Sequence, residues 1–431
     1  MKDRLRPITL LALCLTEFAA QGALAVPGVV GLQLRVVTFH DRLTPESRLS
    51  WVTTVGPIAA MIATVLAGWL SDRTVRRHGH RGSWIVGGAV VGAVAVVFAA
   101  HVTTLPLLVL TWAIAQAGYG ATFAGLFGAV SDIVAAVDRP RVSGWFAAGG
   151  IGGVAVGALF AALLLGKHLG SFGTSTTAFE GLAILAVPIS LLTAWHLSGF
   201  SAQVSAAEPL RPAGLREVLR VMAGAGAPYW WLLLQRLSVQ VAYSCLSLYA
   251  VFYVARRGIA GPADAAHTVA SVTTVGAVIA MVVSAWIARG IAERIGYKAT
   301  IASGIVLLGA ADAVLTVATA HAAYVVANVL AGVGLGIYLA LDLVVALALM
   351  RTEAAGRVLG YFNVARKLPQ SLVPAIGPAL LAIGSGDTVG LDRSKNYVAF
   401  FVFGCVFAVI ALAVVPLLVV PARDDPSADQ S

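Results

Sequence analysis

The segment Gly68–Arg81 reads GWLSDRTVRRHGHR and holds four arginines, two histidines and one aspartate. Long apolar runs flank it, Trp51–Leu70 before it and Ser83–Ala100 after it. At 1.5 Å per helical residue, each run is long enough to cross the roughly 30 Å of hydrocarbon in a bilayer. The sequence therefore predicts two membrane-spanning helices joined by a basic loop. On charge alone, such a loop marks only the cytoplasmic side, where Lys and Arg are retained.

The composition indicates an integral membrane protein. Hydrophobic residues make up 59% of the 431 residues and charged residues only 11%, whereas a soluble domain carries about 25% charged residues. Most of the +9 net charge lies in short loops beside the predicted spans, so it fixes topology and does not indicate nucleic-acid binding. Cys14, Cys245 and Cys405 lie inside apolar runs without ligand-like spacing, so we expect no disulfide, metal site or cofactor.

The apolar runs predict about twelve helices, because every backbone polar group must be satisfied within lipid. The predicted spans are 8–36, 49–70, 83–101, 105–134, 143–166, 178–197, 228–255, 267–288, 298–319, 322–350, 358–384 and 396–420. The termini and the loops on their side hold about 18 Lys and Arg, against about seven on the other side. We therefore expect a multi-pass protein of the plasma (inner) membrane with both termini cytoplasmic.

The longest polar connection divides the chain near its middle. It predicts a cytoplasmic linker over 198–227 between two six-helix halves, 1–197 and 228–421, with a disordered tail over 422–431. The halves echo each other in sequence. Arg141–Phe146 (RVSGWF) opens the fifth span, and Arg357–Phe362 (RVLGYF) opens the eleventh. The echo predicts an internal repeat of six helices.

The order Gly-x-Leu-Ser-Asp-Arg, then two basic residues, a glycine and another basic residue, resembles the signature loop between helices 2 and 3 of the major facilitator superfamily of transporters. The resemblance implies an all-α integral membrane fold of about twelve helices, whose two pseudo-symmetric halves rock about a central site. It also implies a cytoplasmic gate in which Asp72 interacts with basic residues or with the positive N-terminus of span eleven. The residues assigned to this gate are Gly68, Asp72, Arg73, Arg77, Arg81, Arg141, Glu293 and Arg294.

The extended form LSDRTxxRxGxR followed by Trp84 is most similar to the branch of sucrose and glycoside symporters and their bacterial relatives of unknown substrate. Two features differ from that branch. Gly82-Ser83 stand where it has Arg-Pro before the aromatic residue, and span four has Gln116 in place of a buried arginine.

Ionisable side chains at membrane depth are costly, so each is a candidate for function. Glu17 in span one and Arg236 in span seven are predicted at similar depth. Either they pair across the two halves, or each is satisfied within its own half. Gln21 and Gln240 lie one turn further along the same helical faces and extend the polar surface.

Asp342 in span ten is predicted to pair with Arg366 or Lys367 in span eleven, as a static or a moving pair. Together with Gln116, these residues complete the predicted path of solute and coupling ion. No histidine falls at mid-membrane, so a coupled proton would titrate Glu17 or Asp342.

Glycines crowd the fifth predicted span. Gly149, Gly153 and Gly157 recur every four residues, which predicts a smooth face for close helix packing. Drug/proton antiporters of the resembled superfamily have a Gly-Pro motif in this span, and the proline is missing here. We therefore favour packing over a motif function.

These patterns predict a non-enzymatic secondary active transporter of a small organic solute, sugar-like or an amphipathic metabolite, coupled to protons or another cation. The sequence contains no GxxxxGK[ST], HExxH or GxSxG motif. The alternatives are a proton-coupled exporter of hydrophobic compounds, an intramembrane enzyme, and a non-transporting receptor or scaffold derived from a transporter. We expect a monomer within the lipid bilayer and no nucleic-acid partner.

Overall fold

The computed structural model describes residues 7–78, 81–133, 139–167, 172–198, 226–349, 355–384 and 395–419, and within them it is helical without strands. The described residues form twelve long helical segments, which confirms the predicted all-α architecture. The first six are α1 (Pro7–Val26) with η1 (Pro27–Gly31) and α2 (Leu32–Val37), α3 (Pro45–His78), α4 (Gly82–His101), α5 (Leu105–Ile133), α6 (Arg139–Lys167) and α7 (Phe172–Ser198).

The second six segments follow after residue 225. They are α10 (Gly226–Ser247) with α11 (Ala250–Arg256), α12 (Ala265–Val282) with η2 (Val283–Ile287) and α13 (Ala288–Ile295), α14 (Tyr297–Val317), α15 (His321–Leu349), α16 (Ala355–Ala382), and α17 (Tyr397–Val414) with η3 (Val415–Leu417). Among the described residues, nine helices are long and apolar enough to cross a membrane, and the bent pair α10–α11 makes a tenth candidate.

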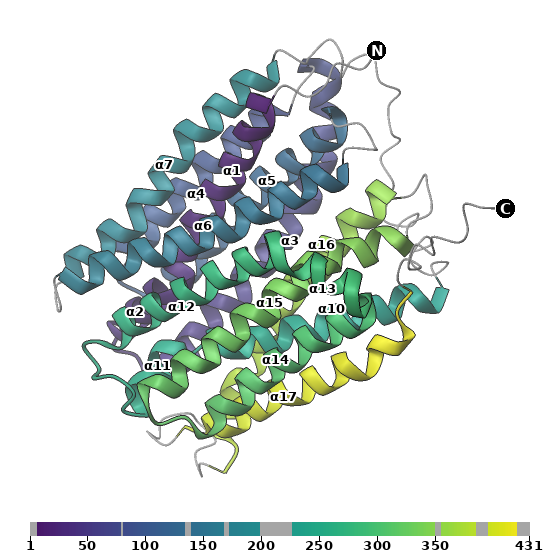
Figure 1. Cartoon of the computed structure of the whole chain (residues 1–431). Helices are drawn as coiled ribbons and strands as arrows, with labels where there is room; N and C mark the ends of the chain where they lie inside the picture. Colours follow the sequence, from purple (N-terminus) through teal and green to yellow (C-terminus); the bar gives the residue numbers. More distant parts are fainter. Residues whose placement is uncertain are drawn as a thin grey trace.

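The helices gather into two groups, α1–α7 and α10–α17, which lie side by side in Figure 1. Within the first group α3 and α4 pack on α5, and α1 packs on α6 and α7; within the second α14 packs on α15 and α17. Two helix pairs make the main contact between the groups, α6 with α12 and α3 with α16. The interface between the groups is therefore formed mainly by these two helix pairs.

The quoted segment is more helical than the sequence suggested. We predicted a basic turn over Gly68–Arg81, but α3 continues to His78, and α4 starts at Gly82. The stretch has no helix-breaking residue between Gly68 and Gly79, and Leu and Arg are good helix formers. The charged residues therefore extend the spanning helix beyond its apolar part and do not form a loop.

Other helical segments contain prolines or a bend. Pro27 opens the π-helical turn η1, because it has no N–H to continue the α-helical ladder. The α10–α11 pair bends by 46° at Leu248–Tyr249. In α16 the three prolines Pro369, Pro374 and Pro378 lie inside one continuous helix.

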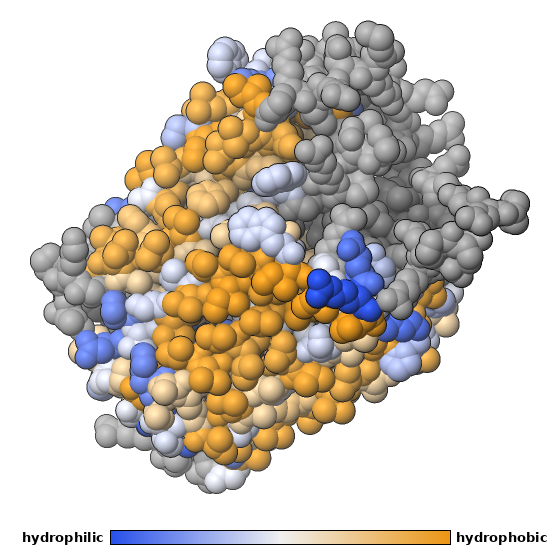
Figure 2. Space-filling view, viewed as in Figure 1, coloured by the Kyte–Doolittle hydropathy of each residue, from blue (hydrophilic) through white to orange (hydrophobic). Residues whose placement is uncertain are grey.

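Apolar side chains cover the outside of the described bundle. In Figure 2 they form a broad band over the visible face of the second group, with hydrophilic residues toward its margins. The most exposed large apolar side chains include Trp286 at 76% and Val317 at 75%. Such exposure is unfavourable in water and is expected for a surface that faces lipid.

Candidate functional site

An ion pair lies inside the second helix group. Arg236 of α10 contacts Asp342 of α15 with 2.8 Å between Nη2 and Oδ2, and both side chains are at most 7% exposed. Tyr338, one helical turn before Asp342, donates its hydroxyl to Asp342 Oδ1 at 3.0 Å. A charge this deeply buried is tolerated only when it is paired and hydrogen-bonded. These three residues, Arg236, Tyr338 and Asp342, are called the central triad below.

The central triad joins residues that the sequence analysis assigned to different pairs. Asp342 was expected to pair with Arg366 or Lys367, and its described ion pair is with Arg236. The side chain of Arg366 lies outside the described residues, and Lys367 is half-buried on α16. Arg236 was one half of the hypothetical pair with Glu17, and its described ion pair lies within its own helix group.

Glu17 has a neutral partner on its own helix. Gln21 Nε2 donates to Glu17 Oε1 at 3.0 Å, and Glu17 is 5% exposed. The carboxylate faces α6, where a Cβ added to Gly150 would lie 3.4 Å from Glu17 Oε1. The predicted polar surface of α1 therefore consists of the Glu17–Gln21 pair, which faces Gly150 of α6.

The glycine face of α6 packs against the backbone of α1, as predicted. A Cβ at Gly149 would lie 3.1 Å from the carbonyl oxygen of Cys14, and one at Gly157 would lie 2.9 Å from that of Gly22. Gly153 sits still closer to the backbone of Phe18. No larger residue fits there without moving the helices apart, so the three glycines set the spacing of α1 and α6.

Gln116 and Gln240, both predicted to lie on the solute path, belong to different helix groups. Gln116 of α5 is 9% exposed, and its Oε1 has no hydrogen-bond partner within the described residues. Its side chain and that of Trp112, one turn earlier, press on Gly56 of α3. Gln240 of α10 is also 9% exposed, one turn beyond Arg236. A buried acceptor left open in this way is a position at which a solute hydroxyl or a water can bind.

The Asp72 end of the bundle, where α3 gives way to α4, holds a compact ion network. Arg81 contacts Asp72 Oδ1 and Asp132 Oδ2, each at 2.7 Å, and also donates to Ser71 Oγ at 2.6 Å. Burial lowers the pKa of Arg81, but its hydrogen bonds to Asp132 and Asp72 and their charges outweigh this and raise it. Arg81 therefore stays charged. Asp132 of α5 thus joins the network through Arg81.

The other assigned gate residues vary in their surroundings. The guanidinium of Arg73 lies 3.5 Å from the centre of the Trp69 ring, a cation–π contact. A Cβ at Gly68 would meet no atom within 4 Å. Glu293 and Arg294 are exposed on α13, and the side chains of Arg77 and Arg141 lie outside the described residues. The two ion pairs of Arg81 at the Asp72 end lie within the first helix group.

The opposite end, named here the Glu46 end, carries polar contacts between the two groups. Glu46 of α3 is 1% exposed and pairs with Arg256 of α11, with 2.8 Å between Oε1 and Nη2. Tyr397 of α17 donates its hydroxyl to the same oxygen at 3.1 Å. Ser50 and Tyr249 share a hydrogen bond of 2.5 Å one turn further in. We call these five residues the cross-group latch.

Sequence reasoning missed the cross-group latch. Arg256 served only in the count of loop charges, and Glu46 was not assigned a role. One signal was available: both residues fall in connections that the charge distribution places on the same side of the membrane. A third helix pair supports the latch, because Gln33 Oε1 of α2 accepts from the backbone N–H of Val251 at 2.9 Å.

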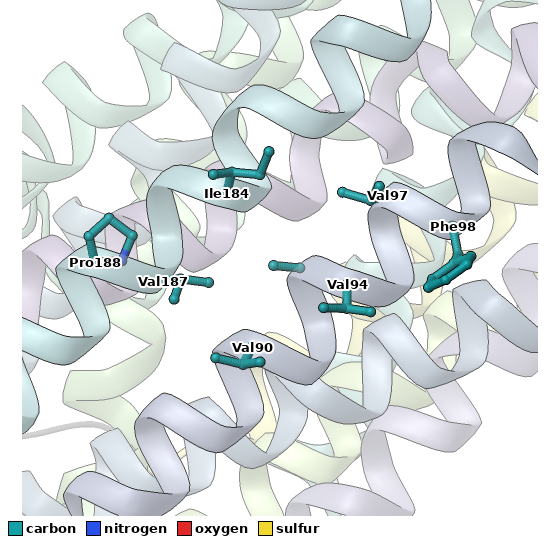
Figure 3. A pocket seen from close by; sticks show the side chains of 8 residues that line it. Val90, Val94, Val97, Phe98, Ile184, Val187 and Pro188 are labelled. Carbon is teal, nitrogen blue, oxygen red and sulfur yellow. The ribbon is translucent and has the colours of Figure 1, made fainter.

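Two cavities open on the described surface. One, of about 420 Å³, lies between α4 and α7 and is lined only by apolar side chains; Figure 3 shows Val94 and Ile184 facing it from the two helices. It lies within the first group and away from the central triad. The other, of about 320 Å³, lies at the Glu46 end and is lined by Arg256, Arg257, Lys395, Asn396, Tyr397 and Val398.

Comparison with solved structures shows the same fold in known transporters. The nucleoside transporter NupG aligns with a TM-score of 0.67 at 14% identity, over 95% of this chain and 98% of that chain. A bacterial homologue of the human lysosomal transporter Spinster, in an inward-facing and unoccupied conformation, aligns with a TM-score of 0.69 at 16% identity, over 97% and 98% of the two chains. A search of curated protein sequences gives no match.

A family model settles the membership that the loop motif and the fold indicate. The model of the Major Facilitator Superfamily matches residues 11–374, which is most of the chain. The matched range includes the quoted segment, the glycine face of α6 and the central triad. This chain therefore belongs to the Major Facilitator Superfamily.

Proposed function

We propose that this protein is a secondary active transporter of a small organic solute, and that residues 1–197 and 228–421 are the two bodies that move. The observation that carries the proposal is the set of polar contacts that join the two groups at the Glu46 end. Contacts of this kind between two bodies must break and re-form when a carrier alternates access.

Charge distribution assigns the two ends to sides of the membrane. The termini and the loops on the Asp72 side carry most of the Lys and Arg, which favours the cytoplasm for that side. The Glu46 end is then extracellular, so the cross-group latch closes the extracellular side.

We assign the coupled proton to Asp342. The family places spans seven and ten beside the central cavity, and Asp342 is the acid there that has a cation as its partner. A proton added to the carboxylate would break the ion pair and free the donors of Arg236 for a solute. Glu17 is the other acid predicted on the path, and Gln21 donates a hydrogen bond to it.

We propose a hydroxyl-rich solute of the sugar class. The donors of Arg236 and Tyr338 and the open acceptor of Gln116 suit hydroxyl groups better than an apolar compound. The likeness of the Gly68–Arg81 segment to sucrose and glycoside symporters supports the same class. The nucleoside transporter among the structural neighbours adds nucleosides to the compounds that deserve testing.

A thermal-shift screen of the purified protein at pH 5.5 and 7.5, against sugars, nucleosides and amphipathic metabolites, tests the substrate class. Stabilisation by a sugar or nucleoside supports the proposal. Stabilisation only by amphipathic compounds would favour the exporter. A protein that binds no solute and shows a single distance at each end by spin-label measurements would be a receptor or scaffold.

Uptake of the identified solute into proteoliposomes under a pH gradient tests the proton assignment. Asp342→Asn should exchange solute but fail to concentrate it, because the carboxyl that carries the proton is gone. Glu17→Gln tests the other predicted acid: loss of concentration in this variant and not in Asp342→Asn would move the assignment to Glu17. Concentration by Asp342→Asn equal to that of the wild type would refute the assignment.

A further inference from the structure

The cavity at the Glu46 end has the chemistry of an anion site. Among its described lining residues, Arg256, Arg257 and Lys395 are positively charged and none is negatively charged. Its volume of about 320 Å³ falls at the lower end of the range of small-molecule sites. Clustered cations repel one another, so a bound anion would stabilise them.

The walls of this cavity are held in place by contacts of their own. Arg257 donates from Nη2 to the carbonyl oxygen of Thr316 at 3.0 Å and lies 6.0 Å from the centre of the Tyr253 ring. Asn396 caps α17 by accepting from the N–H of Ala399 at 2.9 Å. Lys395 directly precedes this capped start of α17, so the position of its backbone is fixed. The ammonium of Lys395 has no described partner.

Arg256 belongs both to the cavity and to the cross-group latch. Its side chain is 31% exposed, whereas its partner Glu46 is 1% exposed. The contact joins one guanidinium nitrogen to Glu46 Oε1, and Glu46 Oε2 has no hydrogen-bond partner within the described residues. A carboxylate or phosphate can offer Arg256 two oxygens at once, which is the stronger geometry.

We propose that this cavity binds a carboxylate or phosphate anion and that the bound anion draws Arg256 away from Glu46. When Arg256 moves away, the buried Glu46 carboxylate keeps only the hydrogen bond that the Tyr397 hydroxyl donates. Separation of the two helix groups lets water reach that carboxylate, so anion binding favours opening of the Glu46 end. By linkage, opening raises the affinity for the anion to the same degree. The binding step is independent of the proposed transport function; the opening step rests on it.

Thermal unfolding in detergent, followed by tryptophan fluorescence, tests the binding step. Inorganic phosphate is titrated against chloride at matched ionic strength. The midpoint should rise saturably in the wild type, and the rise should be lost in Lys395→Gln and in Arg257→Gln. Lys298→Gln is the matched control, because Lys298 is an exposed cation on α14 at the far end of the same group. A rise that persists in both cavity variants, or no saturable rise in the wild type, overturns the site.

Spin labels at Arg42→Cys and Ala263→Cys, in a background without the three natural cysteines, test the opening step. Both positions are exposed and lie on opposite groups at the Glu46 end. Phosphate should shift the distance distribution to longer values, and Glu46→Gln should do so without phosphate. Binding without any lengthening overturns the opening step and leaves the transport proposal unaffected, because solute uptake in phosphate-free buffer is measured separately.

The same labels distinguish a free anion from a lipid headgroup. Nanodiscs of phosphatidylcholine are compared with nanodiscs that contain phosphatidylglycerol. If a lipid phosphate fills the cavity, phosphatidylglycerol lengthens the distance, and added phosphate adds nothing further. If the ligand is a free anion, only added phosphate lengthens it. Either result supports opening driven by an anion in the cavity, and no response in either disc type contradicts the opening step.

Discussion

The Asp72 end and the Glu46 end are both built around an arginine and buried or half-buried carboxylates, but they connect different things. Arg81 joins α3 to α5 within one helix group, and both of its carboxylates lie in that group. Arg256 joins α11 to α3 across the interface. The Arg81 network therefore holds one helix group together, whereas the Arg256 contact links the two helix groups to each other. Breaking them should have different consequences.

Arg81→Met should give the largest loss of stability. The change leaves Asp72 and Asp132 without their shared cation, and removal of one partner from a buried ion pair costs about 3–5 kcal/mol. Asp72 is 39% exposed, so we expect the lower end of that range. Chemical unfolding in detergent measures the loss. The spin-label distance at the Glu46 end should not change, and a large change there would contradict the within-group role.

Arg256→Gln should shift the conformational equilibrium more than it lowers stability. The buried Glu46 loses its cation, and the protein can relieve the cost by opening. If about 1.4 kcal/mol is relieved in this way, the open population rises about tenfold. The spin-label distance between Arg42→Cys and Ala263→Cys measures the opening. Arg257→Gln is the control, because Arg257 contacts its own group, and an equal increase in that control would count against the latch.

Asp72→Ala should have the smallest effect. Arg81 keeps Asp132 and Ser71, and the lost partner is substantially exposed, so we expect a cost of roughly 1 kcal/mol or less. If Asp72 also closes the cytoplasmic end in the opposite state, the variant should favour the inward-facing state further. Distances at the Asp72 end measure this. A shift toward the outward-facing state would contradict the gate assignment.

The sequence predicted features that depend on neighbours along the chain. Apolar run length gave the number of helices, and glycine spacing identified the face of α6 that touches α1. The loop motif brought Asp72 and Arg81 into one functional group, and the structure places them in contact. Each of these features is a local pattern, such as a glycine every four residues or an apolar run of about twenty residues, and a single sequence shows it directly.

Features that depend on packing between distant helices were not predictable. Glu46 and Arg256 lie far apart in the chain, and no local sequence pattern links them. Asp342 had two predicted cations on span eleven, Arg366 and Lys367, and its contact with Arg236 follows from how α10 and α15 face each other. A one-residue rotation of either helix would turn these side chains by about 100° and select another partner.

The glycine contact between α6 and α1 has a mechanical consequence. Two backbones that touch directly have no side chains between them that can rotate, so the pair behaves as a single stiff rod. Glu17 sits on that rod, and its surroundings travel with it when the rod tilts. Arg236 and Asp342 sit on helices that touch sparingly, so their separation can respond to a tilt. When the two helix groups rock, we therefore expect α1 and α6 to move as one unit and the distance between Arg236 and Asp342 to change.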